Sequence, residues 1–182
     1  MLHTIVGKRG RGKTSLAAEI IASQRRDRIW IYDYMAEFQG FAIKDFIEVI
    51  VPGQVGFEEF SNRVWSETPE PAQDPKTGLV TPPKFSTLVI LDEVSSYGRI
   101  GANDHPCLGH FYRLGRHKSI DLVSISQRFY SLPPIVRSQT DVFHVFQITE
   151  PRDTQYLNRL VSPSTLQTIL RLEKFQYINI SL

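Results

Sequence analysis

The segment from Gly7 to Ser15 reads GKRGRGKTS and matches the pattern G-x-x-x-x-G-K-[ST] at every fixed position. Glycines in this pattern let the backbone bend so that successive N–H groups point at a bound phosphate, and a helix that begins beside Gly12 adds the positive end of its dipole. Residues 2–6 are typical of a short buried strand, and residues 16–21 place apolar side chains on one face of a helix. A chance match in a glycine-rich turn would not require this strand and this helix. The sequence therefore predicts a P-loop that binds the phosphates of a nucleotide.

The residues of this loop are expected to bind the nucleotide as a group. Lys13 is expected to reach the β- and γ-phosphates of ATP, and the hydroxyl of Thr14 is expected to hold Mg²⁺. Lys8, Arg9 and Arg11 make the loop unusually basic, which would either strengthen its attraction for phosphate or face a neighbouring subunit. The expected nucleotide ligands in the loop are Gly7, Lys8, Arg9, Gly10, Arg11, Gly12, Lys13, Thr14 and Ser15.

Length and composition fit one folded α/β domain that spans residues 1–182, because 41% of the residues are hydrophobic and 22% are charged. A formal net charge of +2 permits a nucleic-acid partner without arguing for one. The single cysteine, Cys107, excludes a disulfide within the chain and fits a reducing compartment. The sequence contains no apolar run of the roughly 20 residues that span a bilayer and no signal-peptide layout. We therefore expect a soluble intracellular protein that meets a membrane only through a partner.

Strand patterns alternate with helical patterns along the rest of the chain. Apolar and β-branched runs predict strands at 28–32, 47–51, 87–91, 120–126, 142–148 and 175–182, the last at a sheet edge, and helices near 57–64 and 106–118. This alternation predicts a mostly parallel sheet that is flanked by helices. Between residues 67 and 84, five of the 11 prolines interrupt every pattern and predict an exposed loop insertion. We favour a tolerated surface insertion over a contact loop for a neighbour or a nucleic acid.

Acidic residues directly follow two of the predicted strands. Asp33 comes after strand 28–32 and Asp92 comes after strand 87–91, and open α/β sheets bind ligands at the carboxyl ends of their strands. Asp33 is therefore expected beside the nucleotide. Asp92 is expected to hold Mg²⁺ together with the hydroxyl of the P-loop threonine. The alternative for Asp92 is a charged turn after a buried strand.

Glu93 is the residue that distinguishes hydrolysis from phosphate transfer, and Gln127 is a candidate sensor, with an ordinary polar residue at a strand end as its alternative. A carboxylate directly after the metal-binding aspartate can polarise an attacking water, which hydrolysing ATPases need and kinases do not. Gln127 follows strand 120–126 and would lie beside the same phosphate, where it could sense whether the γ-phosphate is still attached. Together these residues predict a hydrolytic site.

Hydrolysis also needs positive charge against the γ-phosphate in the transition state, and a neighbouring subunit commonly supplies it as an arginine finger. Arg116 is our first candidate and Arg113 the second, because both lie on the outer edge of the helix predicted at 106–118. The further candidates are Arg99, Arg128 and Arg137. For each of them the alternative is an ordinary solvated surface arginine.

Five motifs follow one another in an order that resembles the FtsK/HerA superfamily of DNA-pumping ATPases. They are the P-loop, DYMAEF at 33–38, LDE at 91–93, GRHK at 115–118 and SISQR at 124–128. The resemblance covers most of the chain. The short length and the segment 116–127 look most like the genome-packaging ATPases of tailless, membrane-containing icosahedral viruses. The sequence shows no N-terminal barrel of the HerA type and no C-terminal winged helix or membrane anchor of the FtsK type, which favours a minimal packaging motor.

The resemblance implies a RecA-like P-loop core of the type with an additional strand and a catalytic glutamate. It implies a homo-oligomeric ring, expected to be a hexamer, with ATP between neighbouring subunits and double-stranded DNA in the central channel. By resemblance, Lys13 and Thr14 contact phosphate and Mg²⁺, Asp92 holds the metal, Glu93 activates water and Gln127 is the sensor. Proteins of the capsid vertex or of a membrane would be further partners. The host cytoplasm and the packaging vertex of the virion are the expected locations.

Residues 95–104 are our candidate for the loop that touches DNA. Its Tyr97 and Arg99 combine an aromatic ring with a cation, which can ride the phosphate backbone without reading sequence. A disordered surface loop is the alternative.

The leading functional hypothesis is an ATP-driven motor that packages double-stranded DNA into a preformed capsid. Another translocase of the same superfamily, acting in plasmid or chromosome transfer, is the first alternative. A small-molecule kinase is a further alternative, and Glu93 argues against it. A scaffold that binds ATP and assembles without turnover is the last.

Overall fold

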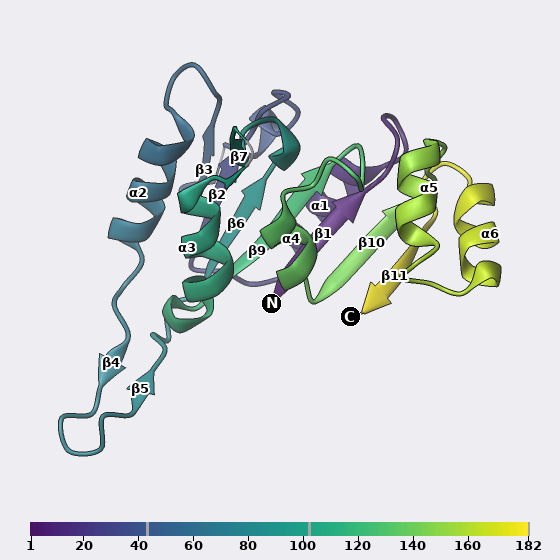
Figure 1. The fold of residues 1–182 in the computed structure, drawn as a ribbon. Coiled ribbons are helices and arrows are strands. Elements are labelled where there is room, and N and C mark those ends of the chain that lie inside the picture. The colour runs from purple at the N-terminus through teal and green to yellow at the C-terminus, as the bar shows by residue number, and fades with distance from the viewer. Residues whose placement is uncertain (43, 102, 182) are drawn as a thin grey trace.

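A seven-stranded sheet forms the centre of the computed structural model, which describes residues 1–42, 44–101 and 103–181 (Figure 1). Six neighbouring strands run parallel, and the C-terminal strand pairs antiparallel at one edge. Across the sheet the strands are β11 (Tyr177–Ser181), β10 (Val142–Phe146), β1 (Leu2–Val6), β9 (Ile120–Ser126), β6 (Thr87–Leu91), β2 (Arg28–Tyr32) and β3 (Ile47–Ile50). The prediction of a mostly parallel sheet closed at its edge by the chain's end is confirmed.

The position of β9 identifies the class of sheet. β9 pairs on one side with β1, which leads into the P-loop, and on the other with β6, which leads into Asp92 and Glu93. In register, Val6 lies opposite Ser126 and Leu91 lies opposite Ser124, so all three strands end at the same edge. An additional strand between the P-loop strand and the acidic strand is the arrangement that was expected for a RecA-like core with a catalytic glutamate, and the fold prediction is confirmed.

Helices cover both faces of the sheet because both faces are apolar. One face packs against α2 (Phe57–Glu67), α3 (Pro106–Leu114) and α4 (Pro134–Gln139), where Phe60 and Phe111 are fully buried. The other face packs against α1 (Lys13–Ser23) through Leu16, Ala17 and Ile21. The helices α5 (Pro151–Leu157) and α6 (Pro163–Arg171) follow β10 and join the first cluster through buried leucine and isoleucine side chains. Burial on both faces explains why strands such as TLVIL at 87–91 are continuously apolar.

The helix predicted at 106–118 is shorter than expected. It ends at Leu114, and a 3₁₀ turn, η3 (Gly115–Lys118), follows. This tighter turn brings Lys118 into the protein, where its ammonium lies 2.6 Å from the carboxylate of Glu70 and 4.8 Å from the centre of the Trp65 ring. The prediction that the α-helix continues to Lys118 was therefore wrong for residues 115–118, where the tighter turn buries the lysine.

Three helices were not predicted from the sequence: α4, α5 and α6. Each begins with a proline at its first turn, at Pro134, Pro151 and Pro163. Proline suits this position because the first N–H groups of a helix have no partner within the helix. These prolines therefore mark the starts of helices, unlike the prolines between residues 67 and 84.

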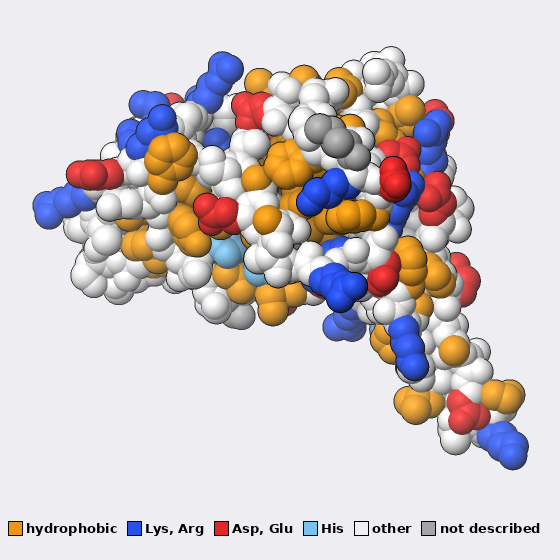
Figure 2. All heavy atoms as spheres, turned by 180° about the vertical axis from the view of Figure 1, so that it is seen from behind, with side chains coloured by type: hydrophobic (Ala, Val, Ile, Leu, Met, Phe, Trp, Pro, Cys, Tyr) orange, Lys and Arg blue, Asp and Glu red, His pale blue; other side chains and the backbone are white. Residues whose placement is uncertain are grey.

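The proline-rich segment forms a short hairpin, not an irregular loop. Its strands are β4 (Ala72–Gln73) and β5 (Val80–Thr81), and they project from the body as an arm (Figures 1 and 2). The carboxylate of Asp74 fixes the turn by accepting hydrogen bonds from the N–H groups of Lys76 and Thr77. The hairpin residues are exposed, as was expected for an insertion without a core of its own. No helix in the described part of the chain is both long enough and apolar enough to cross a bilayer.

The buried face of α3 provides a test of which apolar residues stabilise the fold. Phe111 is fully buried, so Phe111→Ala should lower the free energy of unfolding by about 3–5 kcal/mol, because the removed ring leaves a cavity in the core. Leu79 is 66% exposed on the hairpin, and Leu79→Ala should change it by less than about 0.5 kcal/mol. Urea denaturation followed by circular dichroism measures both variants. Equal losses for the two variants would contradict this packing.

Candidate active site

The P-loop is held rigidly at the edge of the sheet. The N–H of Gly7 donates to the carbonyl of Ser126, the last residue of β9, and the N–H of Lys8 donates to the carbonyl of Gln147 directly after β10. Gly12 has φ +110° at the start of α1, a conformation that side-chain-bearing residues rarely adopt. The loop is therefore anchored to both neighbouring strands and leads directly into a helix N-terminus, where backbone N–H groups are free to bind phosphate.

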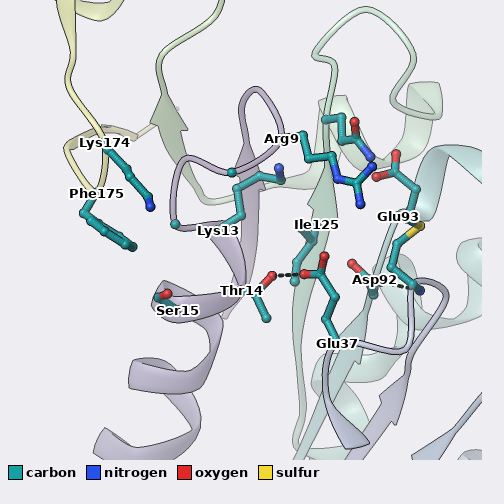
Figure 3. Close-up of a pocket in the computed structure, with 14 residues that line it drawn as sticks. Arg9, Lys13, Thr14, Ser15, Glu37, Asp92, Glu93, Ile125, Lys174 and Phe175 are labelled. Atoms are coloured by element: carbon teal, nitrogen blue, oxygen red, sulfur yellow. Dashed lines mark hydrogen bonds between the residues drawn. The ribbon is translucent and has the colours of Figure 1, made fainter.

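The P-loop forms one wall of a cavity of about 290 Å³ (Figure 3). Arg9 and Glu93 lie at one end of the cavity, Ser15 and Phe175 lie at the other, and Thr14 lies between the two ends. Of the residues predicted from the sequence, the cavity brings together Arg9, Gly10, Gly12, Lys13, Thr14, Ser15, Asp92, Glu93 and Gln127. Of the expected nucleotide ligands, Gly7, Lys8, Arg11 and Asp33 do not line it.

Lys13 is the buried cation of the loop. Its side chain is 8% exposed, and its ammonium donates a 3.3 Å hydrogen bond to the carbonyl of Lys8. Burial lowers the pKa of Lys13, while the carboxylates of Glu93, Glu37 and Asp92 act in the opposite direction. A cation already withdrawn from water interacts strongly with a phosphate, because the local dielectric constant is low.

Thr14 and Asp92, the two residues expected to hold Mg²⁺, both line the cavity. Asp92 is 4% exposed, and its carboxylate accepts a 2.9 Å hydrogen bond from the N–H of Met35. Burial raises the pKa of Asp92 to about 6, and the negative charges of Asp33, Glu37 and Glu93 add to the shift. A carboxylate in such surroundings would gain from a bound cation that compensates its charge.

These residues fit Mg²⁺. The described residues contain no cluster of three or more histidine, cysteine or acidic side chains in metal-binding geometry. Mg²⁺ does not need one, since it is usually bound through one or two protein oxygens together with substrate phosphates and water. The Thr14 hydroxyl and the Asp92 carboxylate offer this kind of oxygen set.

The position of Asp33 does not support its expected contact with the nucleotide. Asp33 is fully buried, and its carboxylate accepts hydrogen bonds from the N–H groups of Glu37 and Phe38 and from the amide of Gln39. These hydrogen bonds shape the loop after β2, and Asp33 does not line the cavity. Glu37, at the end of that loop, enters the cavity instead and accepts a hydrogen bond from the hydroxyl of Thr14. The motif DYMAEF therefore places its second carboxylate, not its first, at the site.

Glu93 has a backbone conformation that is unusual for its residue type. Its φ and ψ are +47° and +51°, a left-handed conformation that costs of order 1 kcal/mol or more outside glycine. The hydroxyl of Ser95 donates a 2.6 Å hydrogen bond to its carboxylate, and the hydroxyl of Ser126 lies 3.4 Å from that of Ser95. These contacts link the catalytic candidate to the end of β9, directly before Gln127. Glu93 and Gln127 both line the cavity.

The arginine-finger candidates lie away from this cavity. Arg113 and Arg116 line a separate hollow with Met1 and Asp141, at the edge where β1 and β10 begin. This is the opposite edge of the sheet from the P-loop, so neither arginine can reach the cavity of its own chain. Both are exposed, which leaves them accessible to a neighbouring subunit. Their role as a finger stays a prediction.

The other three arginines make contacts within the chain. Arg99 donates to the carbonyl of Leu132, Arg128 pairs with Glu150 at 3.4 Å, and Arg137 lies over the ring of Tyr156. Arg9 is the arginine that enters the cavity, and its position beside Glu93 was not predicted from the sequence (Figure 3).

The described residues of the expected DNA-contacting loop form a short hairpin and an aromatic contact within the chain. Arg99–Ile100 (β7) pairs with Asn103–Asp104 (β8) in a short hairpin, and Ala102 lies outside the described residues. Tyr97 packs 4.6 Å from the ring of Phe57 and 4.9 Å from that of Tyr32, and its hydroxyl is buried. A contact of Tyr97 with DNA is therefore corrected to a packing role, because its ring belongs to an aromatic cluster over α2. Ile100, at 59% exposure, is the apolar residue that this hairpin presents to solvent.

Comparison with known proteins decides what this arrangement resembles. No protein-family model matches the sequence, and no curated protein matches it. Among solved structures, the genome-packaging NTPase B204 from Sulfolobus turreted icosahedral virus 2, in complex with ATP-gammaS, matches with a TM-score of 0.76 and 18% identity. The match covers 99% of this chain and 91% of that chain. The chain therefore shares the fold of this P-loop NTPase.

Two more distant structures of this fold also match. The cytoplasmic domain of EssC matches with a TM-score of 0.59 at 15% identity, over 85% of this chain and 32% of that chain. The N-terminal domain of zonular occludens toxin from Neisseria meningitidis matches with a TM-score of 0.51 at 15% identity, over 84% of this chain and 78% of that chain. The superfamily resemblance predicted from the order of the motifs is confirmed at the level of the fold.

The raised pKa of Asp92 predicts that ionisation of this carboxylate lowers the free energy of unfolding. The folded protein holds the Asp92 proton up to a pH of about 6, whereas an unfolded aspartate loses it near a pH of about 3.9. The contribution of Asp92 to the free energy of unfolding therefore falls as pH rises through this window. We expect Asp92→Asn to melt at a higher temperature than the parent at pH 7.5 and at the same temperature at pH 4.

Differential scanning fluorimetry without nucleotide or divalent metal measures this difference. Asp45→Asn, at an exposed position, is the control and should match the parent at both pH values. An Asp92→Asn variant that melts at or below the parent temperature at pH 7.5 would show that the buried charge is compensated elsewhere in the site.

Proposed function

We propose that this protein is an ATP-hydrolysing motor that translocates double-stranded DNA and packages a viral genome into a preformed capsid. One observation carries the proposal: the P-loop residues Lys13 and Thr14 share a cavity with Asp92, Glu93 and Gln127, which come from two other strands. The fold shared with a genome-packaging NTPase supports the DNA substrate. Structures of that NTPase with ATP-gammaS and AMPPCP support ATP as the ligand.

The cavity suggests how the γ-phosphate would be hydrolysed. The triphosphate would lie along the P-loop, with its γ end toward Glu93 and with Lys13 compensating the charge on the β- and γ-phosphates. Glu93 would accept a proton from the water that attacks the γ-phosphorus. Gln127 would contact the same phosphate and report its loss to β9. When bound by Thr14 and Asp92, Mg²⁺ would supply further compensation of the phosphate charge.

Subunit assembly would complete the site. The exposed Arg116, with Arg113 as the second candidate, would enter the cavity of a neighbouring subunit in a homo-oligomeric ring, which we propose to be a hexamer around DNA. The described residues of the cavity already supply Arg9 and Lys13 from the same chain, so the finger would add charge that appears only on assembly. Proteins of the capsid vertex or a membrane are proposed partners, with action in the host cytoplasm and at the packaging vertex.

Transfer of plasmid or chromosomal DNA by a related translocase is the second candidate function. This chain shares its fold with the cytoplasmic domain of EssC as well as with the genome-packaging NTPase, so the fold is compatible with either function. A small-molecule kinase fits less well, since Glu93 at the γ-phosphate end would favour attack by water over transfer to another substrate.

Replacement of Glu93 tests hydrolysis directly. Glu93→Gln removes the proton acceptor and keeps the size of the side chain, so steady-state ATP hydrolysis should fall roughly a hundredfold or more while ATP binding is retained. The parent rate should rise when duplex DNA is added. Glu58→Gln, at an exposed position on α2, is the matched control and should keep the parent rate. A Glu93→Gln variant that hydrolyses ATP as fast as the parent would remove this mechanism.

Mixed rings test whether Arg116 acts on a neighbour. Arg116→Ala and Glu93→Gln proteins should each be inactive alone. When they are mixed, an intact Glu93 in one subunit can face an intact Arg116 from the other, so ATP hydrolysis should return to a fraction of the parent rate. Mixing that restores nothing, measured alongside an Arg113→Ala and Glu93→Gln pair, would exclude Arg116 as the finger.

A further inference from the structure

The end of the cavity away from Glu93 is formed by the chain's C-terminal segment. Lys174 and Phe175 precede β11 and lie beside Ser15 at the start of α1 (Figure 3). Phe175 is 58% exposed, so most of its apolar surface remains in water and contributes little to the stability of the fold. Its φ is +67°, which is rare for a bulky residue. Neither its exposure nor its backbone conformation is what a purely structural phenylalanine needs.

The P-loop itself holds Phe175 in this place. The N–H of Phe175 donates a 2.8 Å hydrogen bond to the carbonyl of Arg11. The ring lies so close to Gly12 that a Cβ at that position would come within 2.5 Å of its Cδ1 atom. The ammonium of Lys174 lies 4.9 Å from the centre of the same ring. An aromatic face is thus fixed directly against the turn that is proposed to bind phosphate, with a cation beside it.

The direction of the triphosphate then determines what meets this ring. If the γ end points to Glu93, the ribose and base must leave the P-loop toward Ser15 and Phe175, at the opposite end of the cavity. We propose that Phe175 stacks on the nucleotide base and that Lys174 exchanges its contact with the ring for the α-phosphate. This inference rests on the proposed function, because it takes the direction of the bound nucleotide from it.

The same residues assign the class of base. A phenylalanine face attracts any aromatic base, and the attraction grows with the overlapping area, which favours purines over pyrimidines. Among the described cavity residues at this end, Ser15 and Lys174 are the polar side chains, and neither forms a paired donor and acceptor that could read a base edge. The site should therefore accept both ATP and GTP, and hydrolysis should not be restricted to adenine nucleotides.

Calorimetric binding of ATP, GTP and inorganic tripolyphosphate to the parent and to Phe175 variants tests this inference. Tripolyphosphate has no base, so Phe175→Ala should weaken ATP and GTP by roughly tenfold each and leave tripolyphosphate within about twofold of the parent. Phe175→Trp keeps an aromatic face and should retain the parent affinity for ATP. Tyr130→Ala removes a ring that is 52% exposed and does not line this cavity, and it should change none of the three affinities.

The outcomes separate this inference from the proposed function. An equal loss for ATP and tripolyphosphate in Phe175→Ala would mean that the ring only supports the loop, and an unchanged ATP affinity would mean that it does not meet the base. Parent protein that binds ATP more than about tenfold tighter than GTP would overturn the assignment of base class. Parent protein that binds neither ATP nor tripolyphosphate would contradict the proposed function and this inference together, whereas binding that Lys13→Ala abolishes supports the function whatever Phe175 does.

Discussion

The placement of β9 between β1 and β6 is the constraint on which the proposed site depends. If β1 and β6 were direct neighbours, Asp92 and Glu93 would lie directly against the P-loop, with no strand end between them. Because β9 pairs with both, the distance across the cavity is set by two strand spacings, each about 4.8 Å, and Gln127 is placed at the middle position. Hydrogen bonds from Gly7 to the last residue of β9 and from Lys8 to the residue after β10 then fix the loop to this frame.

Charge and strain at the site are compensated by the rest of the fold. The cavity region gathers Asp92, Glu93 and Glu37 around one buried lysine, and the raised pKa of Asp92 records the cost of this arrangement. Glu93 adds a left-handed backbone conformation. A sheet packed on both faces supplies the burial that keeps such a site folded, and ligand phosphates and a metal ion would relieve the acidic crowding. The crowded carboxylates therefore destabilise the protein without ligand, and the same carboxylates would favour the binding of a metal ion.

The parts of the molecule that follow from local chemistry were predictable. The P-loop, the pair Asp92–Glu93 and Gln127 each belong to a short motif at the end of an apolar strand, and parallel pairing brings such ends together. Asp33 shows the limit, because a buried carboxylate that caps its own loop has the same sequence signature as one that faces a ligand. Phe175 and Glu37 depend on contacts between segments far apart in the chain, so their place in the cavity could not be read from spacing. Proline had two meanings: it opened the helices at 134, 151 and 163, and it marked the exposed hairpin.

Movement of DNA driven by ATP is the central claim, and a triplex-displacement measurement tests it most directly. A third strand bound near one end of a linear duplex is released when a translocase runs along the duplex. An assembled ring of this protein should displace the third strand with ATP and fail to do so with a non-hydrolysable analogue. Assembled rings that hydrolyse ATP and bind the duplex, yet leave the third strand in place, would contradict translocation while leaving the hydrolytic site intact.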